Sequence, residues 1–167
     1  MSSAAIKLLG EFGLKTATGV APFIVRHFYK AGRLQAGLKI RIVERGQGIW
    51  MNCGELPEFR AWLRVTNLTL FDLTIDRLYG HLCHGSQLAE FQSLERREVP
   101  TRSEMEFMVS GKLAAEHVAF VRKNLGQRFE TYLNLSGFVH SRLQNFEITG
   151  REVRTGNVEI INCSPPA

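Results

Sequence analysis

Several features that mark common protein classes are missing from this sequence. No uncharged apolar run reaches the length that a membrane-spanning helix needs. The first residues carry Lys7, Glu11 and Lys15 inside their apolar stretch, so they do not resemble the uncharged core of a secretory signal peptide. We therefore predict a cytoplasmic protein, with contact to a membrane limited to its surface.

Cysteine is scarce, and no motif for a metal or a phosphate group is present. The three cysteines are Cys53, Cys83 and Cys163, and none lies in a CxxC spacing. Reduced thiols are expected in the cytoplasm, with at most one bridge if the protein is exported. Glycine-rich phosphate loops are also missing, because the Gly46–Gly48 stretch lies between two predicted strands and predicts a hairpin turn. The sequence predicts neither a metal nor a cofactor.

Length and composition are typical of one folded domain. The chain has 167 residues, of which 44% are hydrophobic and 22% are charged. These values allow a single sizeable core and do not suggest disorder or a repeat array. The formal net charge of +5 permits attraction to acidic lipid without requiring it.

Short alternating segments dominate the chain from residue 38 onward. Alternation of apolar and polar side chains with a period of two is typical of strands that bury one face. Turn residues separate these segments at short intervals. Strands are predicted at residues 38–44, 48–53, 58–66, 71–83, 104–110, 128–136, 143–148 and 157–162.

The segment 58–83 holds the clearest strand pattern and one break in it. At residues 58–66 the odd-numbered positions are apolar, and the even-numbered ones are mostly polar. In the next strand the apolar positions are odd up to Ile75 and even from Leu78 onward. A change of parity within a strand requires an extra residue, so we predict a β-bulge near Asp76 and Arg77.

One helix interrupts the strands, at about residues 113–125, where Ala114, Val118, Val121 and Leu125 recur at helical spacing. Many short strands with a single internal helix do not fit alternating strand and helix units. They favour a mainly β fold, an antiparallel β-sandwich of the immunoglobulin or fibronectin type III kind.

The N-terminal residues 1–37 differ in kind, because they predict two short amphipathic helices. The first covers about residues 4–15, and the second begins near Pro22 and closes at Gly32. An apolar face with basic neighbours suits the surface of an acidic membrane. The residues expected to contact a membrane or a partner are Ile6, Lys7, Leu9, Phe12, Lys15, Ile24, Arg26, Phe28, Lys30 and Arg33.

The same two helices fit other arrangements. They could pack on the domain or on a second copy of the chain, or they could become ordered only with a protein partner. Homo-oligomers are therefore left open. Nucleic acid is not predicted as a partner, because Arg60, Trp62 and Arg64 alone are too few interleaved basic and aromatic residues.

Two clusters resemble catalytic or metal-binding groups, and both are interpreted as structural. His81, Cys83 and His84 do not share one side of a strand, so they could meet at one ion only at a distorted strand end. Asp72 and Asp76 have the same parity but fit the solvated face of a strand. The sequence thus predicts no catalytic residue and no enzyme.

Four stretches, residues 59–67, 70–79, 85–90 and 99–105, form a hydrophobic strand that ends in Asn, a following strand, a turn and a further strand start. In this order they resemble the late embryogenesis abundant group 2 domain, also called the water-stress and hypersensitive-response (WHy) domain. The family usually has Asn-Pro-Asn after the first strand, whereas this chain has Asn67-Leu68-Thr69. The resemblance makes Asn67 and Thr69 the loop motif, and Asn67 is expected to be a corner residue.

The resemblance implies a fibronectin-like β-sandwich, a link to stress tolerance and no catalytic residues. We predict a helical extension at residues 1–37, a sandwich at 38–163 and a tail at 164–167. The expected function is a non-enzymatic binding or protective module, attached to a membrane surface or to a larger assembly. The alternative is a carrier of lipid or of a small apolar ligand, with a pocket lined by Phe107, Leu133 and Phe138.

Overall fold

The computed structural model describes residues 30–43 and 48–164, and strands dominate them. Its elements are α3 (Ala31–Gly37), β1 (Leu38–Ile42), β2 (Ile49–Asn52), β3 (Glu58–Asn67), β4 (Leu73–His84), β5 (Ser86–Ser93), β6 (Arg97–Val99), β7 (Glu104–Lys112), α4 (Ala115–Lys123), β8 (Thr131–Ser141), β9 (Phe146–Thr155) and β10 (Val158–Ile161).

The first sheet is built around β3. Strand β7 pairs with one edge of β3, and β1 and β2 follow one another along the other edge, all antiparallel to β3. Strand β10 extends the sheet as a parallel neighbour of β2. Since β1 and β2 pair with β3 and not with each other, the predicted hairpin between them is wrong. Only Trp62 of β3 separates the positions opposite Ile42 and Ile49.

The second sheet is built in the same way around β4. Strand β8 pairs with one edge of β4, β9 pairs with β8, and β5 and β6 share the other edge of β4. The register between β4 and β8 shifts between Ile75 and Arg77, so Asp76 is the extra residue of a bulge. The bulge predicted from the change of parity is confirmed.

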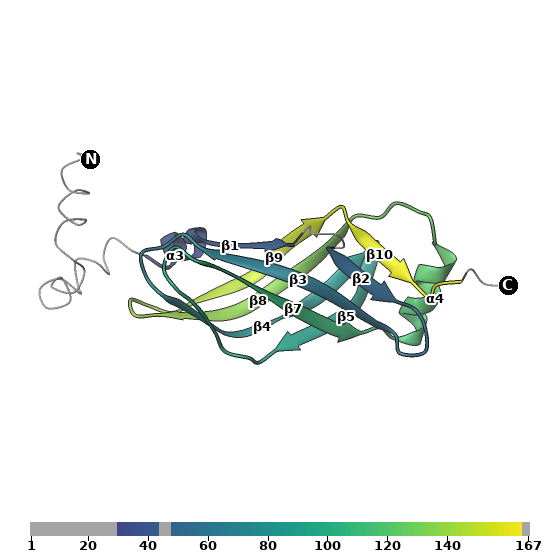
Figure 1. Ribbon diagram of the computed structural model, residues 1–167, viewed down its shortest axis with the longest axis horizontal. Coiled ribbons are helices and arrows are strands. Elements are labelled where there is room, and N and C mark those ends of the chain that lie inside the picture. The colour runs from purple at the N-terminus through teal and green to yellow at the C-terminus, as the bar shows by residue number, and fades with distance from the viewer. Residues whose placement is uncertain (1–29, 44–47, 165–167) are drawn as a thin grey trace, which may run out of the picture.

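The two sheets bury their alternating apolar side chains in one core. Phe59 of β3 and Phe91 of β5 meet edge to face, with ring centroids 6.1 Å apart. At Gly111 of β7 a Cβ atom would lie 2.2 Å from the Glu90 carbonyl oxygen, so only glycine allows the approach of β7 to β5 seen here. Helices α3 and α4 lie at opposite ends of the elongated β structure (Figure 1).

The N-terminal boundary differs from the sequence pattern. Helix α3 continues through Gly32, where the sequence predicted a helix to close, and ends at Gly37. Leu34 has no exposed surface and belongs to the core. This helix is therefore packed on the sheets.

Candidate functional site

The outer face of the second sheet carries an open groove of about 470 Å³. Strand alternation produces it, because Arg77, Tyr79 and His81 occupy every second position of β4 and share one face. The lining residues are Arg77, Tyr79, Gly80, His81, Glu90, Phe91, Gln92 and Phe138.

Cross-strand pairing orders the groove into rows. Glu90 of β5 and Asn134 of β8 flank His81, while Gln92 and Ser136 flank Tyr79. These pairs place polar groups beside an aromatic ring along the length of the groove.

A third row of the groove consists of Arg77 and Phe138. The bulge at Asp76 shifts the register between β4 and β8 so that these two residues lie opposite each other. Tyr79 is 40% exposed and Phe138 38% exposed, which gives the groove two accessible rings. A cation, a carboxylate and two rings on an open surface suit contact with another molecule more than enclosure of a substrate.

His81 and Glu90 are the two titratable side chains that face one another across strands in the groove. His81 and Glu90 are cross-strand neighbours, yet no hydrogen bond or ion pair joins their side chains among the residues that the structure describes. Within the same described part of the chain, no group of three His, Cys, Asp or Glu side chains could hold a metal ion.

The other members of the predicted His/Cys cluster serve the core. His84 is buried, its Nδ1 lies 2.7 Å from Thr131 Oγ1, and its ring meets that of Phe129 edge to face. Burial lowers the pKa of His84, so the neutral form is favoured. Cys83 is buried and lies opposite Tyr132 of β8, and the interaction with this thiol is the main cause of the raised pKa of Tyr132. The three residues therefore do not converge.

The two aspartates also have separate partners. Asp72 Oδ1 accepts a hydrogen bond of 2.8 Å from the backbone N–H of Thr101, which fixes the loop before β7. Asp76 lies at the bulge, with its Oδ2 3.7 Å from His140 Nε2. They do not act as a carboxylate pair.

Asn67 is a corner residue at the end of β3, with no exposed surface. Its Nδ2 lies 2.8 to 3.1 Å from the carbonyl oxygens of Phe71, Val99 and Pro100. Its Oδ1 accepts bonds from the backbone N–H and the hydroxyl of Thr69, at 2.9 and 2.7 Å. The side chain thus satisfies buried backbone groups of two loops.

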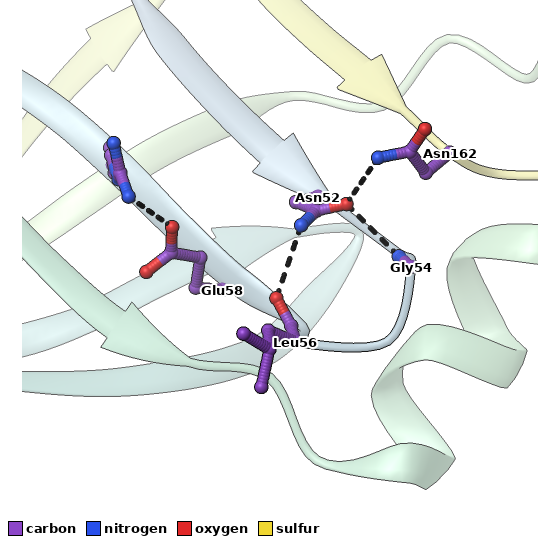
Figure 2. A network of polar contacts seen from close by, with 6 residues as sticks. Asn52, Gly54, Leu56, Glu58 and Asn162 are labelled. Carbon is purple, nitrogen blue, oxygen red and sulfur yellow. Dashed lines mark hydrogen bonds and ion pairs between the residues drawn. The ribbon is translucent and has the colours of Figure 1, made fainter.

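A second asparagine organises the opposite end of the first sheet (Figure 2). Asn52 ends β2, and its Oδ1 accepts bonds from Gly54 N–H at 3.0 Å and from Asn162 Nδ2 at 2.9 Å. Its Nδ2 donates to the Leu56 carbonyl at 3.1 Å. Asn52 therefore shapes the turn between β2 and β3 and binds the end of β10. The sequence analysis missed this residue, although its place after a short predicted strand matches that of Asn67.

The outer face of the first sheet has its own exposed aromatic residue, Trp62, beside Met108 of β7. The sequence analysis considered Trp62 with Arg60 and Arg64 as a nucleic-acid surface. In the structure, Arg60 pairs with Glu58 and Arg64 with Glu106. Both guanidinium groups thus already have a carboxylate neighbour.

The predicted pocket between the sheets is not formed by the residues named for it. Leu133 is fully buried, whereas Phe138, five positions later on β8, faces the outer groove. The guanidinium of Arg97 lies over the ring of Phe107, with 4.1 Å between Arg97 Cζ and the ring centroid. These three side chains do not line one cavity.

Most of the predicted N-terminal contact residues lie outside the described residues. Lys30 and Arg33 are described and exposed, beside the buried Leu34 of α3. In the described ranges no helix has the length and hydropathy to cross a bilayer. The residues outside the described part are Ile6, Lys7, Leu9, Phe12, Lys15, Ile24, Arg26 and Phe28.

No protein-family model matches the chain, and no curated protein matches it. Among solved structures, it is similar to a solution structure assigned to a late embryogenesis abundant protein, with 12% identity, a TM-score of 0.44, and coverage of 92% of this chain and 85% of that one. It is also similar to a structure assigned to the ApaA protein of Bordetella pertussis, with 12% identity, a TM-score of 0.42, and coverage of 75% and 91%. The chain is similar, too, to a protein from Archaeoglobus fulgidus, with 13% identity and a TM-score of 0.40. The match covers 71% of this chain and 93% of that one. These identities and TM-scores are too low to establish a common function.

Proposed function

We propose that the chain is a non-enzymatic binding module, held at an acidic membrane surface by residues 1–29 and presenting the groove over β4, β5 and β8 to a partner. One observation carries the non-enzymatic part. Three residues of the two candidate clusters, His84, Cys83 and Asp72, are each engaged in contacts within the fold.

The membrane part of the proposal rests on the sequence of the N-terminal segment and on the position of α3. The segment alternates apolar residues with lysine and arginine, and it leads into α3, whose Leu34 is buried in the core. A basic apolar segment joined to a folded body through a packed helix would hold that body close to an acidic bilayer.

We also assign the module to the late embryogenesis abundant group 2 kind, with a fibronectin-like sandwich and a protective role in stress. The support is the corner formed by Asn67 and Thr69, the residues that carry the resemblance. Thr69 uses its hydroxyl and its N–H to bind Asn67, so this loop forms without the proline that the family usually has.

Flotation of the full chain with vesicles of phosphatidylcholine, with and without phosphatidylserine, tests the membrane contact. We expect the chain to float only with the acidic vesicles, and less at high salt. The triple variant K7E/K15E/R26E should remain at the bottom of the gradient.

A matched variant separates the segment from the net charge. K39E/R41E/K112E makes the same change in charge on exposed residues of β1 and β7 and should still float. Loss of flotation in both variants would leave only a general charge effect, and no flotation of the wild type would remove the membrane from the proposal.

The alternative, a carrier of lipid or of an apolar ligand, would use the outer groove. A fluorescent fatty acid would then bind the wild type and lose affinity for the F138S variant, which alters the groove and leaves the core intact. We expect no saturable binding, because the groove is open along the sheet.

A further inference from the structure

Cys53 and Cys163 lie together at the end of the first sheet. Cys53 follows β2, and its backbone N–H donates to the Ile161 carbonyl of β10 at 3.0 Å. Asn162 has a φ of 53°, so the chain turns directly after β10. The side chain of Asn162 binds that of Asn52 (Figure 2), and Cys163 follows directly, near enough to Cys53 to contribute to the raised pKa of the Cys53 thiol.

The two thiols differ in access to solvent. Cys53 has no exposed surface, whereas Cys163 is partly exposed. Burial, followed by the contact with Cys163, raises the pKa of Cys53 to about 12. Arg122 of α4 donates a 2.8 Å hydrogen bond to the Cys53 carbonyl and further fixes this residue. An oxidant therefore reaches Cys163 first.

We propose that Cys53 and Cys163 are a redox site, which closes to a reversible intramolecular disulfide on reaction with a low-molecular-weight disulfide of the glutathione class. The hydrogen bonds of Asn52, Asn162 and the Cys53 N–H hold the two residues in position before the reaction. Cys83, on β4 of the other sheet, is not part of this site.

The reaction is a thiol–disulfide exchange in two steps. The Cys163 thiolate attacks one sulfur of the small disulfide, which forms a mixed disulfide and releases one small thiolate. The Cys53 thiol then loses its proton, attacks the Cys163 sulfur and expels the second small thiolate. The protein gives up two electrons and two protons, and the small disulfide becomes two thiols.

The bond would join β2 to the end of β10 and enclose most of the sandwich between the two cysteines. A cross-link over so long a stretch restricts the unfolded chain strongly. We expect oxidation to raise the melting temperature by about 5–10 °C. The proposed site would make the stability of this sheet end depend on the redox state.

The test incubates the full chain with oxidised and reduced glutathione at graded ratios, and counts free thiols under denaturing conditions. The count should fall from three to one, with a peptide pair that joins Cys53 to Cys163. C83S should oxidise like the wild type, and C163S should not gain the melting shift. C53S should retain a glutathione adduct on Cys163.

Three results would overturn the proposal. The first is a thiol count that stays at three in the most oxidising mixture. The second is a stable glutathione adduct on Cys163 of the wild type that Cys53 does not displace. The third is a bridge that includes Cys83 or joins two chains.

Discussion

The two ends of β3 have the same hydrogen-bonding arrangement at different depths. Asn67 ends β3, and Asn52 lies opposite Glu58, where β3 begins. Each Oδ1 accepts from the backbone N–H two residues later, and each Nδ2 donates to the carbonyl four residues later. Asn67 is fully buried, while Asn52 is partly exposed.

The comparison shows that neighbouring residues determine the hydrogen-bonding pattern of the asparagine. Its contribution to the free energy of unfolding depends on whether water can reach the groups that it binds. At Asn52, solvent can replace the lost hydrogen bonds. At Asn67, the bonds to the Val99 carbonyl and from the Thr69 N–H are buried, so solvent cannot replace them. An unsatisfied buried polar group costs about 1–3 kcal/mol.

The largest expected effect is that of removing the buried amide. N67A should lower the free energy of unfolding by about 3 kcal/mol or more, because the carbonyl of Val99 and the N–H of Thr69 each lose a buried hydrogen bond. N52A should lower it by about 0.5–1 kcal/mol, the value of exposed hydrogen bonds. Urea unfolding of both variants measures this, and equal losses would break the comparison.

The glycine next to each asparagine corner gives the second test. A Cβ atom at Gly37 would lie 2.5 Å from Thr69 Cγ2, whereas one at Gly54 would lie 3.1 Å from Asn52 Oδ1. G37A should therefore cost about 1–3 kcal/mol by overpacking, and G54A less.

A second change shows whether the collision is the cause. T69S removes the methyl group that the new Cβ would meet and keeps the hydroxyl that binds Asn67. G37A/T69S should recover most of the loss in urea unfolding. As a further control, G32A in α3 meets nothing within 4 Å and should stabilise the protein by about 0.5–1 kcal/mol.

The sequence predicted Asn67 and the bulge, because both are local in the chain. An Asn after a clear alternating strand and a change of parity can be read without knowing the sheet partners. Strand β5 was missed, because Ser, Gln and Glu weaken its pattern and its start was read as a turn.

Features that depend on pairing could not be predicted. The contact between Cys53 and Cys163 requires the parallel pairing of β2 with β10, which are far apart in the chain. The groove requires the register that sets Arg77 opposite Phe138. The prediction of a hairpin between β1 and β2 failed for the same reason. A short gap between two strands indicates a hairpin, but the sequence does not show that both strands pair with β3 instead.

The third test concerns pH, at the end of the molecule that contains α4 and Asn52. Burial lowers the pKa of His84, while the unfolded chain titrates near 6.5. The contribution of His84 is therefore fully present above about pH 6.5 and is lost as the pH falls towards the folded pKa, because only the unfolded state takes up the proton.

The H84Q variant isolates this contribution. Glutamine can still bind Thr131 Oγ1 but does not titrate, so H84Q should lose less stability than the wild type between pH 7.5 and 5.5 in urea unfolding. H81Q, in the outer groove, keeps His84 and should follow the wild type. Equal slopes for H84Q and the wild type would assign the pH dependence to other groups.

The smallest effect is expected between the two ends, at the exposed pair of Arg64 and Glu106. Arg64 Nε and Nη2 lie 2.8 and 2.5 Å from Glu106 Oε1, yet both side chains remain accessible to solvent. Exposed ion pairs on a sheet are screened by water and salt, so their net value is small. R64A should leave the urea midpoint within experimental error of the wild type, and a double-mutant cycle with E106A should show weak coupling that salt abolishes. A loss greater than that of N52A would mean that the middle of β3, and not its ends, controls the stability of this sheet.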